Sequence, residues 1–376
     1  MTNFKEYQVN FKKNIKMIVT IAILLMLTGG GYLFLEQKQF GALPSGERLA
    51  RIQHSPNYKD GQFQNLSPTP DLAPDVSYWY ILKQYMSKPD GTEPSQTIPS
   101  VKIDLKSIQT DKPVVVWFGH SSYFIKIKGK NILVDPVFSG QASPVSFFGK
   151  NYKGSNVYNV ADFPELDLVL ITHDHYDHLD YKTIMQLKDK TKVFYTSLGV
   201  GAHLEYWGIN ANNIKEFDWW QSENLSDSIR ITATPARHFS GRKFKRNQSL
   251  WASYVLETSD YKLFLGGDSG YDTHFKTIGQ RFGSFDLVLL ECGQYNTSWP
   301  YIHMMPEEVA QAANDLNAKV LMPVHWAKFT LALHPWNEPV KRLLKKTISM
   351  NIKTITPQIG EKVILNEVYP DKIWWE

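Results

Sequence analysis

The sequence predicts a layered α/β domain that is preceded by one membrane-spanning helix. The first observation is a series of short apolar or alternating runs that begins after Pro113 and is interrupted by helical patterns. Strands that alternate with helices are typical of domains with sheets inside and helices outside. The second observation is a long uncharged run near the N-terminus. The third is a hydrophobic content of 43% in 376 residues, which is enough for a large core.

Composition and charge exclude several classes of protein. Aromatic residues make up 13% and charged residues 21% of the chain, so it is not a disordered polymer. The single cysteine, Cys292, excludes a disulfide framework and a multi-thiolate metal site, and it follows an apolar run, so we expect it to be buried. The net charge is +4, of which +3 lies in residues 1–40. The remaining chain is almost neutral, and we therefore expect no nucleic-acid partner.

Residues 17–35 contain no charged side chain and are long enough to cross a bilayer. Lys12, Lys13 and Lys16 precede this run, and the positive-inside rule then predicts a cytoplasmic N-terminus. We expect a single-pass membrane protein whose folded domain is extracytoplasmic. A cleaved signal peptide is the alternative, because residues 28–30 (Thr-Gly-Gly) resemble a small-residue cleavage site. The product would then be secreted or periplasmic.

Residues 37–110 are rich in Pro, Gly, Ser and Gln and have weak periodicity. Turn signals occur at residues 66–70 and 87–91. We expect an extended arm that carries one helix near residues 77–86. The chain then divides into a cytoplasmic tail and anchor (1–36), an N-terminal arm (37–110) and one catalytic domain (111–376).

The regular elements of the domain are predicted from periodicity and turn signals. Helices are expected at 182–188, 306–316 and 338–348, the second of which opens on Pro306 followed by two acidic residues. Strands are expected at 114–118, 122–128, 131–135, 168–172, 192–196, 229–234, 250–257, 262–265, 287–291 and 320–324.

The most informative segment follows the predicted strand at 168–172. It reads His173-Asp-His175-Tyr-Asp177-His178, which places three imidazoles and two carboxylates in one short loop. Imidazole nitrogens and carboxylate oxygens are the ligands of zinc and similar divalent ions. His173 and His175 can share one ion, while Asp177 and His178 turn toward a second.

Three later strands also end in one possible ligand each. His238 follows the strand at 229–234, Asp268 follows the strand at 262–265, and His325 follows the strand at 320–324. Taken alone, each of these residues is more often a structural hydrogen-bonding group. Together with the first loop they make seven protein ligands, which is enough for two ions with a bridging carboxylate.

With these residues the chain resembles the metallo-β-lactamase fold superfamily. The resemblance implies an αβ/βα sandwich with the metals at one edge. It implies that His173, His175 and His238 hold one ion, that Asp177, His178 and His325 hold the other, and that Asp268 bridges them. The cofactors would be two divalent ions, with zinc as the default and iron or manganese as alternatives.

A narrower resemblance concerns residues 50–340. The motifs at 117–121 (WFGHS), 135–139 (DPVFS), 142–146 (ASPVS), 235–241 (PARHFSG), 266–271 (GGDSGY), 303–308 (HMMPEE) and 324–328 (VHWAK) are similar to those of N-acyl-phosphatidylethanolamine-hydrolysing phospholipase D and its bacterial relatives. This branch implies a phosphodiesterase that acts on a phospholipid. The membrane-spanning segment is a feature of this chain and is not carried over.

Such a site would use a hydroxide between the two ions and would need no side-chain nucleophile. Asp268 would balance the charge of the ions, and His303, which the resemblance places beside the site, would protonate the leaving oxygen. Asp135 and Asp180 are candidates for orienting the ligand imidazoles, with turn or capping roles as the alternative.

Three residues are predicted to bind substrate. Arg242 and Arg246 lie in a basic stretch after the His238 loop and could attract an anionic headgroup, although a solvated basic loop is the alternative. His120 would line the floor of the pocket or form a hydrogen bond to it, and we do not expect it to bind a metal.

The leading hypothesis is therefore a membrane-tethered metallohydrolase of phospholipase D type, with N-acyl phosphatidylethanolamine or a related lipid as substrate and the membrane as its partner. The alternatives are a metallohydrolase of a lactone or a small soluble phosphodiester and, least favoured because all seven ligand positions are filled, a non-catalytic binding protein. The oligomeric state stays open.

Overall fold

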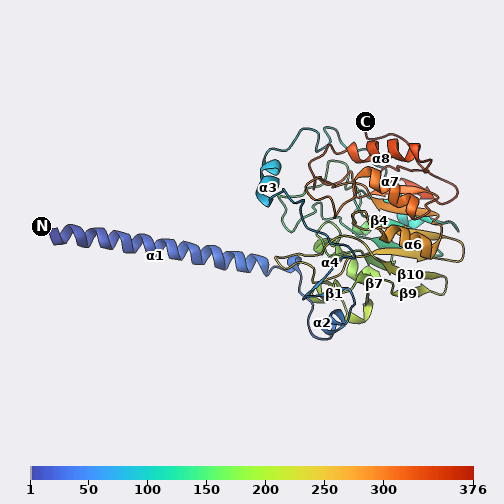
Figure 1. Ribbon diagram of the computed structural model, residues 1–376. Helices are drawn as coiled ribbons and strands as arrows, with labels where there is room; N and C mark the ends of the chain where they lie inside the picture. The colour runs from blue at the N-terminus through green and yellow to red at the C-terminus, as the bar shows by residue number, and fades with distance from the viewer. Residues whose placement is uncertain (1) are drawn as a thin grey trace.

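A computed structural model describes residues 2–376 and has two mixed β-sheets packed face to face with helices outside them (Figure 1). The first sheet has the strand order β15-β3-β4-β5-β6-β7-β8, and the second has the order β14-β13-β12-β11-β10-β9. This is the αβ/βα sandwich that the sequence predicts.

The first sheet is antiparallel from β15 to β5 and parallel from β5 to β8. Its strands are β3 (Val114–Trp117), β4 (Tyr123–Ile127), β5 (Lys130–Val134), β6 (Leu166–Ile171), β7 (Thr191–Ser197), β8 (Ile214–Phe217) and β15 (Lys362–Ile364).

In the second sheet β11 is antiparallel to both β10 and β12, so β10 runs in the same direction as β12. β13 and β14 continue this direction in parallel. The carboxyl ends of β10, β12 and β14 consequently meet at one edge. The strands are β9 (Ser222–Ser226), β10 (Ile229–Thr234), β11 (Ser253–Glu257), β12 (Lys262–Leu265), β13 (Leu287–Glu291) and β14 (Leu321–Val324).

The largest hydrophobic cluster lies between the sheets and includes Val115 and Ile125 from the first and Leu263 and Leu289 from the second. A second cluster joins the outer face of the first sheet to α4 (Tyr181–Leu187) and α5 (Gly201–Tyr206). A third joins the outer face of the second sheet to α6 (His274–Phe282), α7 (Pro306–Asp315) and α8 (Glu338–Ser349). Burial on both faces explains why the central strands are apolar along most of their length.

The N-terminal arm lies on the domain and contributes Ile52 and Phe63 to the main cluster. It contains α2 (Gly46–Gln53), a hairpin of β1 (Tyr58–Lys59) and β2 (Gln62–Phe63), and α3 (Tyr78–Met86). Short 3-10 helices occur at Lys38–Phe40, Leu105–Ser107, Val160–Asp162, Lys188–Lys190 and Ala211–Asn213.

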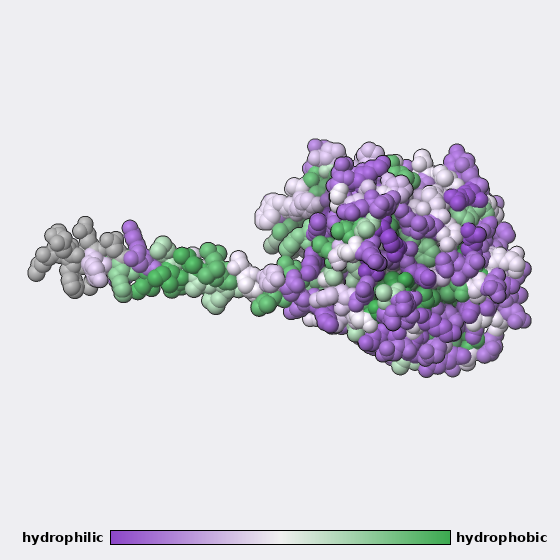
Figure 2. Space-filling view, turned by 90° about the horizontal axis from the view of Figure 1, so that it is seen from below, coloured by the Kyte–Doolittle hydropathy of each residue, from purple (hydrophilic) through white to green (hydrophobic). Residues whose placement is uncertain are grey.

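The helix α1 (Thr2–Leu35) projects from one side of the domain (Figure 1). Its segment Phe11–Leu35 has a mean hydropathy of 2.2 and no buried part, so by length and composition it could cross a membrane. An N-terminal signal sequence would have the same properties. In Figure 2 the hydrophobic side chains of this segment contrast with the largely hydrophilic surface of the domain.

The predicted helices are confirmed within one or two residues, and every predicted strand overlaps an observed one. Cys292 is buried, as expected. The prediction missed the short or peripheral strands β1, β2, β8, β9 and β15 and the helices α2, α5 and α6.

Candidate metal centre

The seven predicted ligands come together where the strand ends of the two sheets meet. His173, His175, Asp177 and His178 lie in the loop after β6, and His238, Asp268 and His325 follow β10, β12 and β14. Each of these strands is buried along almost its whole length, so packing of the core fixes where the following loop begins. The loops therefore need little ordering of their own to hold the side chains close together.

The first group consists of His173, His175, His238 and Asp268, each with a ligand atom within 4.8 Å of the others. His175 Nδ1 lies 2.9 Å from His173 Nε2 and 3.2 Å from His238 Nε2. Asp268 Oδ2 lies 3.9 Å from His173 Nε2 and 3.7 Å from His238 Nε2. Three imidazoles and one carboxylate oxygen thus surround one point.

The second group contains the predicted ligands Asp177, His178 and His325, together with His120. Asp268 Oδ1 lies 3.2 Å from both His178 Nε2 and His325 Nδ1. One oxygen of Asp268 therefore faces the first group and the other faces the second. This is the geometry that a bridging carboxylate requires.

Hydrogen bonds on the side facing away from the centre fix the orientation of the His238 and His178 imidazoles. His238 Nδ1 donates to the carbonyl of Ile302 at 2.8 Å. His178 Nδ1 donates to Asp135 Oδ2 at 2.8 Å. A hydrogen on Nδ1 leaves the lone pair of Nε2 free, and in both residues Nε2 points into the centre.

His173 is oriented by a relay that starts at the same carboxylate. Thr172 Oγ1 donates to Asp135 Oδ2 at 2.7 Å, so the same hydroxyl can accept from His173 Nδ1, which lies 3.0 Å away. Asp135 therefore supports two imidazoles at once. This is the arrangement that commonly holds metal-binding histidines.

Several side-chain atoms of the predicted ligands lack any hydrogen-bond partner among the described residues although they are buried. They are His178 Nε2, His325 Nε2 and Asp268 Oδ1. Such atoms are costly in a protein interior unless something binds them. Neutral imidazole nitrogens and a carboxylate oxygen are donors that suit divalent zinc, iron or manganese, so the residues present fit a metal pair.

The pKa values follow from this crowding. Burial, reinforced by neighbouring imidazoles, holds the pKa values of His173, His238 and His325 well below their usual range, and burial lowers the pKa of His175 to about 4. These imidazoles are neutral, as metal binding requires. Burial also opposes a charge on His178, but Asp268, Asp177 and Asp135 raise its pKa well above normal. The three carboxylates therefore favour positive charge at the second group, either as a proton on His178 or as a divalent cation, which would replace that proton.

His303 lies beside the centre, in the loop between β13 and α7, as predicted. Its ring is 5.1 Å from that of His238 and 5.3 Å from that of His325. On its other side His303 Nδ1 lies 3.5 Å from Glu291 Oε2. Burial raises the pKa of Glu291 well above its usual range.

Glu291 was missed by the sequence analysis. It is a single carboxyl at the end of the apolar strand β13, which is the same signal that indicated Asp268. Its Oε1 accepts from the Met304 amide at 2.6 Å and so holds the loop that carries His303.

Asp135 and Asp180 have different positions. Asp135 orients His178, as predicted, with its backbone in the left-handed region at a φ of 40°. Asp180 caps α4 by accepting from the Lys182 amide at 3.1 Å, and it also accepts from the Ser139 amide at 2.9 Å. Asp180 therefore has the capping role that was the alternative for it.

His120 does not lie where a substrate-binding residue would. It is fully buried, and its Nε2 lies 2.8 Å from Asp177 Oδ2. Its backbone amide donates to the carbonyl of Trp326, and its own carbonyl accepts from His325. This position suits a residue that holds Asp177 and His325 in place.

The position of Arg242 also differs from its predicted role in binding an anionic headgroup. Its guanidinium is buried, and it donates to the carbonyls of Gln39, Asp174 and Leu179 at 2.7–2.8 Å. It also stacks on Tyr176, 4.1 Å from the ring centroid. Because its donors are used in this way, Arg242 supports the loop after β6 (residues 172–180), which we call the metal-binding loop because it carries four of the predicted ligands. Arg242 is therefore poorly placed to bind a headgroup.

Arg246 has its guanidinium 4.5 Å from the ring centroid of Phe239 and pairs with Asp71. Phe239 in turn lies against His175, with ring centroids 4.4 Å apart. Arg246 is exposed near the centre, and its contact with substrate stays a prediction.

Comparisons with known proteins show what this chain is similar to. Residues 130–326 match the family model of the "Beta-lactamase superfamily domain". An uncharacterized protein of Mycobacterium tuberculosis is 39% identical over 330 residues, which cover 86% of this chain and 88% of that protein. The N-acyl-phosphatidylethanolamine-hydrolyzing phospholipase D 1 of Caenorhabditis elegans is 30% identical over 228 residues, which cover 57% of this chain and 64% of that enzyme.

Among solved structures, Igni18, a metallo hydrolase from Ignicoccus hospitalis, superposes with a TM-score of 0.52 at 18% identity. The match covers 68% of this chain and all of Igni18. At this identity the likeness concerns the fold.

Proposed function

Because this chain belongs to the metallo-β-lactamase superfamily of metal-dependent hydrolases, we propose that it is a membrane-anchored phosphodiesterase of phospholipase D type. Its proposed substrate is N-acyl phosphatidylethanolamine or a related phospholipid. The observation that carries this substrate class is the 30% identity with the C. elegans phospholipase D over 228 residues.

We propose two divalent ions as cofactors, with zinc as the first candidate. The first ion would be held by His173, His175 and His238. The second would be held by Asp177, His178 and His325, and Asp268 would contact both ions. When bound, such ions polarise a phosphoryl oxygen and activate a water molecule at neutral pH. The two oxygens of Asp268, which face different groups, support its bridging role.

In the proposed reaction water adds to phosphorus, and the bond between phosphorus and the oxygen of the N-acylethanolamine breaks. The oxygen of the water stays on phosphatidic acid, and the leaving oxygen takes up a proton. His303 is the proposed donor, because it lies between His238 and His325 and is partly open to solvent. Glu291, behind it, would keep the ring in place.

The proposed membrane arrangement has a cytoplasmic tail and anchor over residues 1–36, an arm over 37–110 and an extracytoplasmic catalytic domain over 111–376. The length and hydropathy of Phe11–Leu35 support an anchor. The three lysines that precede residue 17 support the orientation.

The test uses full-length, metal-replete protein in detergent, incubated with N-acyl phosphatidylethanolamine and with a total lipid extract. Mass spectrometry should detect phosphatidic acid and N-acylethanolamine. Metal-loaded protein that leaves these lipids intact but opens a lactone or cleaves a soluble phosphodiester would overturn the substrate proposal.

The variant Asp268→Asn tests the bridging role. We expect it to fold, to lose activity by at least about a hundredfold and to bind fewer than two ions per chain, because a neutral amide cannot balance two cations. Asp260→Asn is the control, since Asp260 is exposed on the β11–β12 turn and pairs only with Lys128. Metal content is measured by elemental mass spectrometry. Turnover and metal content equal to those of wild type would contradict the bridging role.

A further inference from the structure

We propose that the face of the domain beside α1 docks onto the same bilayer that α1 spans, with α3 and the loop 141–150 lying at the level of the lipid headgroups. This inference rests on the anchor role proposed for α1. We call this surface the docking face and define it by six exposed side chains: Tyr78, Trp79, Leu82, Met86, Phe147 and Phe148.

The exposure of α3 is the first argument. None of its nine residues is buried, and Trp79 is 62% and Met86 78% exposed. Its sequence, YWYILKQYM, contains four aromatic residues and one charge, Lys83. Water disfavours so many large side chains on one short helix, whereas Trp and Tyr favour the membrane interface, where an apolar ring and a polar tip are both satisfied.

The second argument is position. In Figure 1, α3 lies above the end of α1, on the side of the domain from which α1 emerges. Figure 2, turned by 90°, also shows an apolar area on the side of the domain nearest the anchor. A bilayer around the anchor segment would therefore meet this side of the domain first.

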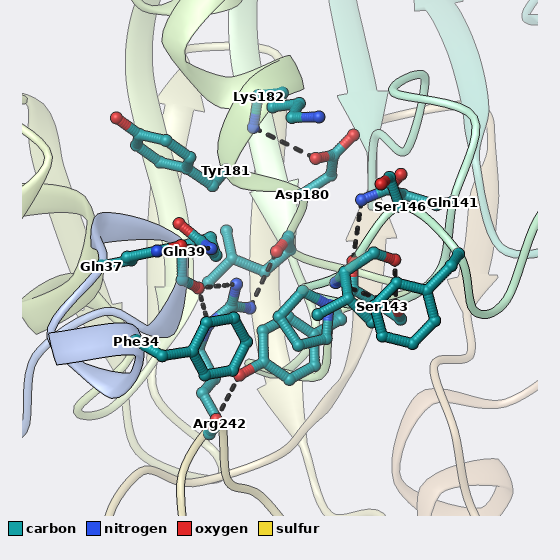
Figure 3. A pocket seen from close by; sticks show the side chains of 15 residues that line it. Phe34, Gln37, Gln39, Gln141, Ser143, Ser146, Asp180, Tyr181, Lys182 and Arg242 are labelled. Carbon is teal, nitrogen blue, oxygen red and sulfur yellow. Dashed lines mark hydrogen bonds between the residues drawn. The ribbon is translucent and has the colours of Figure 1, made fainter. Parts of the chain in front are cut away.

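The third argument is that the docking face is continuous with the end of the anchor. Phe34, near the end of α1, and Phe147 line the same cavity of about 320 Å³. Figure 3 shows Phe34 and Gln39 on one side of this cavity and Ser143 and Gln141 on the other. Phe147 is 81% exposed, so it projects outward from this junction.

The loop is joined to α3 through one residue. Leu331 packs in a cluster with Ala142, and its carbonyl accepts a hydrogen bond from Tyr85 of α3. The Ala142 amide in turn donates to the carbonyl of Gly149 at 2.8 Å, which closes the loop that carries Phe147 and Phe148. The loop is therefore linked to the end of α1 through the shared cavity and to α3 through Leu331.

Docking would also bring the metal-binding loop to the bilayer. Tyr176 and Leu179 of that loop line the same cavity as Phe34 and Phe147. A lipid headgroup at the docking face would then lie beside the metal-binding loop. The bilayer is a better occupant than a second protein because the anchor already holds this side of the domain close to lipid.

The experiment measures lipid contact at single cysteines labelled with the fluorophore NBD. Full-length protein is reconstituted in phosphatidylcholine vesicles with and without doxyl-labelled phosphatidylcholine, which quenches NBD on contact. Cys292→Ala is the background. The test positions are Met86→Cys and Phe147→Cys, and Ile348→Cys is the matched control, because Ile348 on α8 is as exposed as Met86 at 78%. Leu25→Cys reports insertion of the anchor.

We expect quenching at positions 25, 86 and 147, at least about threefold greater than at 348, because interfacial side chains lie within the headgroup and upper acyl region. Quenching at 25 with only the control level at 86 and 147 would overturn the docking face and leave the anchor. No quenching at 25 would overturn both. A blue-shifted but unquenched label at 86 would show that protein covers α3, which also overturns the proposal.

Discussion

At the scale of single residues, the candidate centre depends on side chains that are not themselves predicted ligands. Asp135 accepts from the Thr172 amide and hydroxyl and from His178 Nδ1, so one carboxylate fixes the tautomers of two inner imidazoles. His120, Asp135 and His325 all have backbone in the left-handed region, with φ between 40° and 65°. Such strain persists where surrounding contacts impose it, and it is common at functional sites.

This arrangement predicts that Asp135→Asn weakens metal binding. The amide nitrogen of Asn would face the hydroxyl of Thr172 and the N–H of His178, and at least one of these donors would lose its acceptor. We expect metal affinity to fall about 10–100-fold, as for other outer partners of ligand histidines. Competition with a chelating dye measures the affinity.

Asp167→Asn is the matched control for that measurement. Asp167 is also a buried carboxylate, but it lies near the start of β6, at the end of that strand opposite the candidate centre, and it pairs with Lys192. Equal metal affinities for the two variants would contradict the role given to Asp135.

A second residue-scale prediction concerns pH. His274 is fully buried at the start of α6, with its Nε2 3.2 Å from Ser269 Oγ, and burial lowers its pKa to about 3. In the unfolded chain a histidine has a pKa of about 6.5. As the pH falls below 6.5 the unfolded chain gains a proton that the folded chain does not, so the free energy of unfolding decreases down to about pH 3.

The variant His274→Phe should lack this dependence. Between pH 7 and pH 5, its free energy of unfolding should fall by about 2 kcal/mol less than that of wild type. Urea denaturation at both pH values measures the difference. His54→Phe, at the exposed C-cap position after α2, should behave as wild type. The same pH dependence in His274→Phe and wild type would refute this account.

At the scale of elements, aromatic and hydrogen-bond contacts join the end of α1 to the loop after β6. Phe34 stacks edge-on against Phe40 at 4.9 Å, and Phe40 lies against Tyr176 of the metal-binding loop at 6.2 Å. Arg242 donates to the carbonyls of Gln39 and of the loop. The end of α1 is therefore fixed to the loop that carries four of the predicted ligands.

We expect Arg242→Met to destabilise the domain by about 3 kcal/mol, because three buried carbonyls lose a charged donor and methionine cannot replace it. Lys243→Met is the neighbouring control. Lys243 pairs only with the exposed Glu36 and should change stability by less than about 0.5 kcal/mol. Thermal unfolding in detergent measures both. A small decrease in unfolding temperature for Arg242→Met, equal to that of the control, would contradict the role of Arg242 in connecting residue 39 to the loop after β6.

The elements also show what the sequence can and cannot predict. Central strands such as β6 and β13 were predicted because both of their faces are buried, which leaves a continuous apolar signal. β9 and β15 were missed because they are edge strands whose partners lie far away in the sequence or which carry mostly polar side chains. α5 was missed because it has only six residues.

The same distinction holds for the site. Each predicted ligand lies in the loop that follows an apolar strand, so local sequence indicates its position. The surroundings of Arg242 depend on carbonyls of residues 39, 174 and 179, which no local pattern brings together. Composition correctly indicates that this stretch is basic, but it cannot tell which of its cations is exposed.

At the scale of the whole molecule, charge and hydropathy are divided between two parts. Residues 1–40 carry +3 of the net charge of +4, and the uncharged run 17–35 lies directly after Lys16. The helix that contains this run packs against nothing in the described chain over Phe11–Leu35. For a helix of this kind the positive-inside rule predicts a cytoplasmic positive flank and a following domain on the other side of the membrane.

This division predicts the labelling pattern of single cysteines in spheroplasts, in a Cys292→Ala background. A membrane-impermeant maleimide should label Asp260→Cys, on the exposed β11–β12 turn, before permeabilisation, and Lys12→Cys only afterwards. Labelling of both positions before permeabilisation, or of position 260 only afterwards, would contradict the orientation. A chain shortened by about thirty residues that never labels at position 12 would instead show cleavage near residues 28–30, as for a signal peptide. The domain would then be released, and the hydrolase would have to meet its lipid from solution without an anchor.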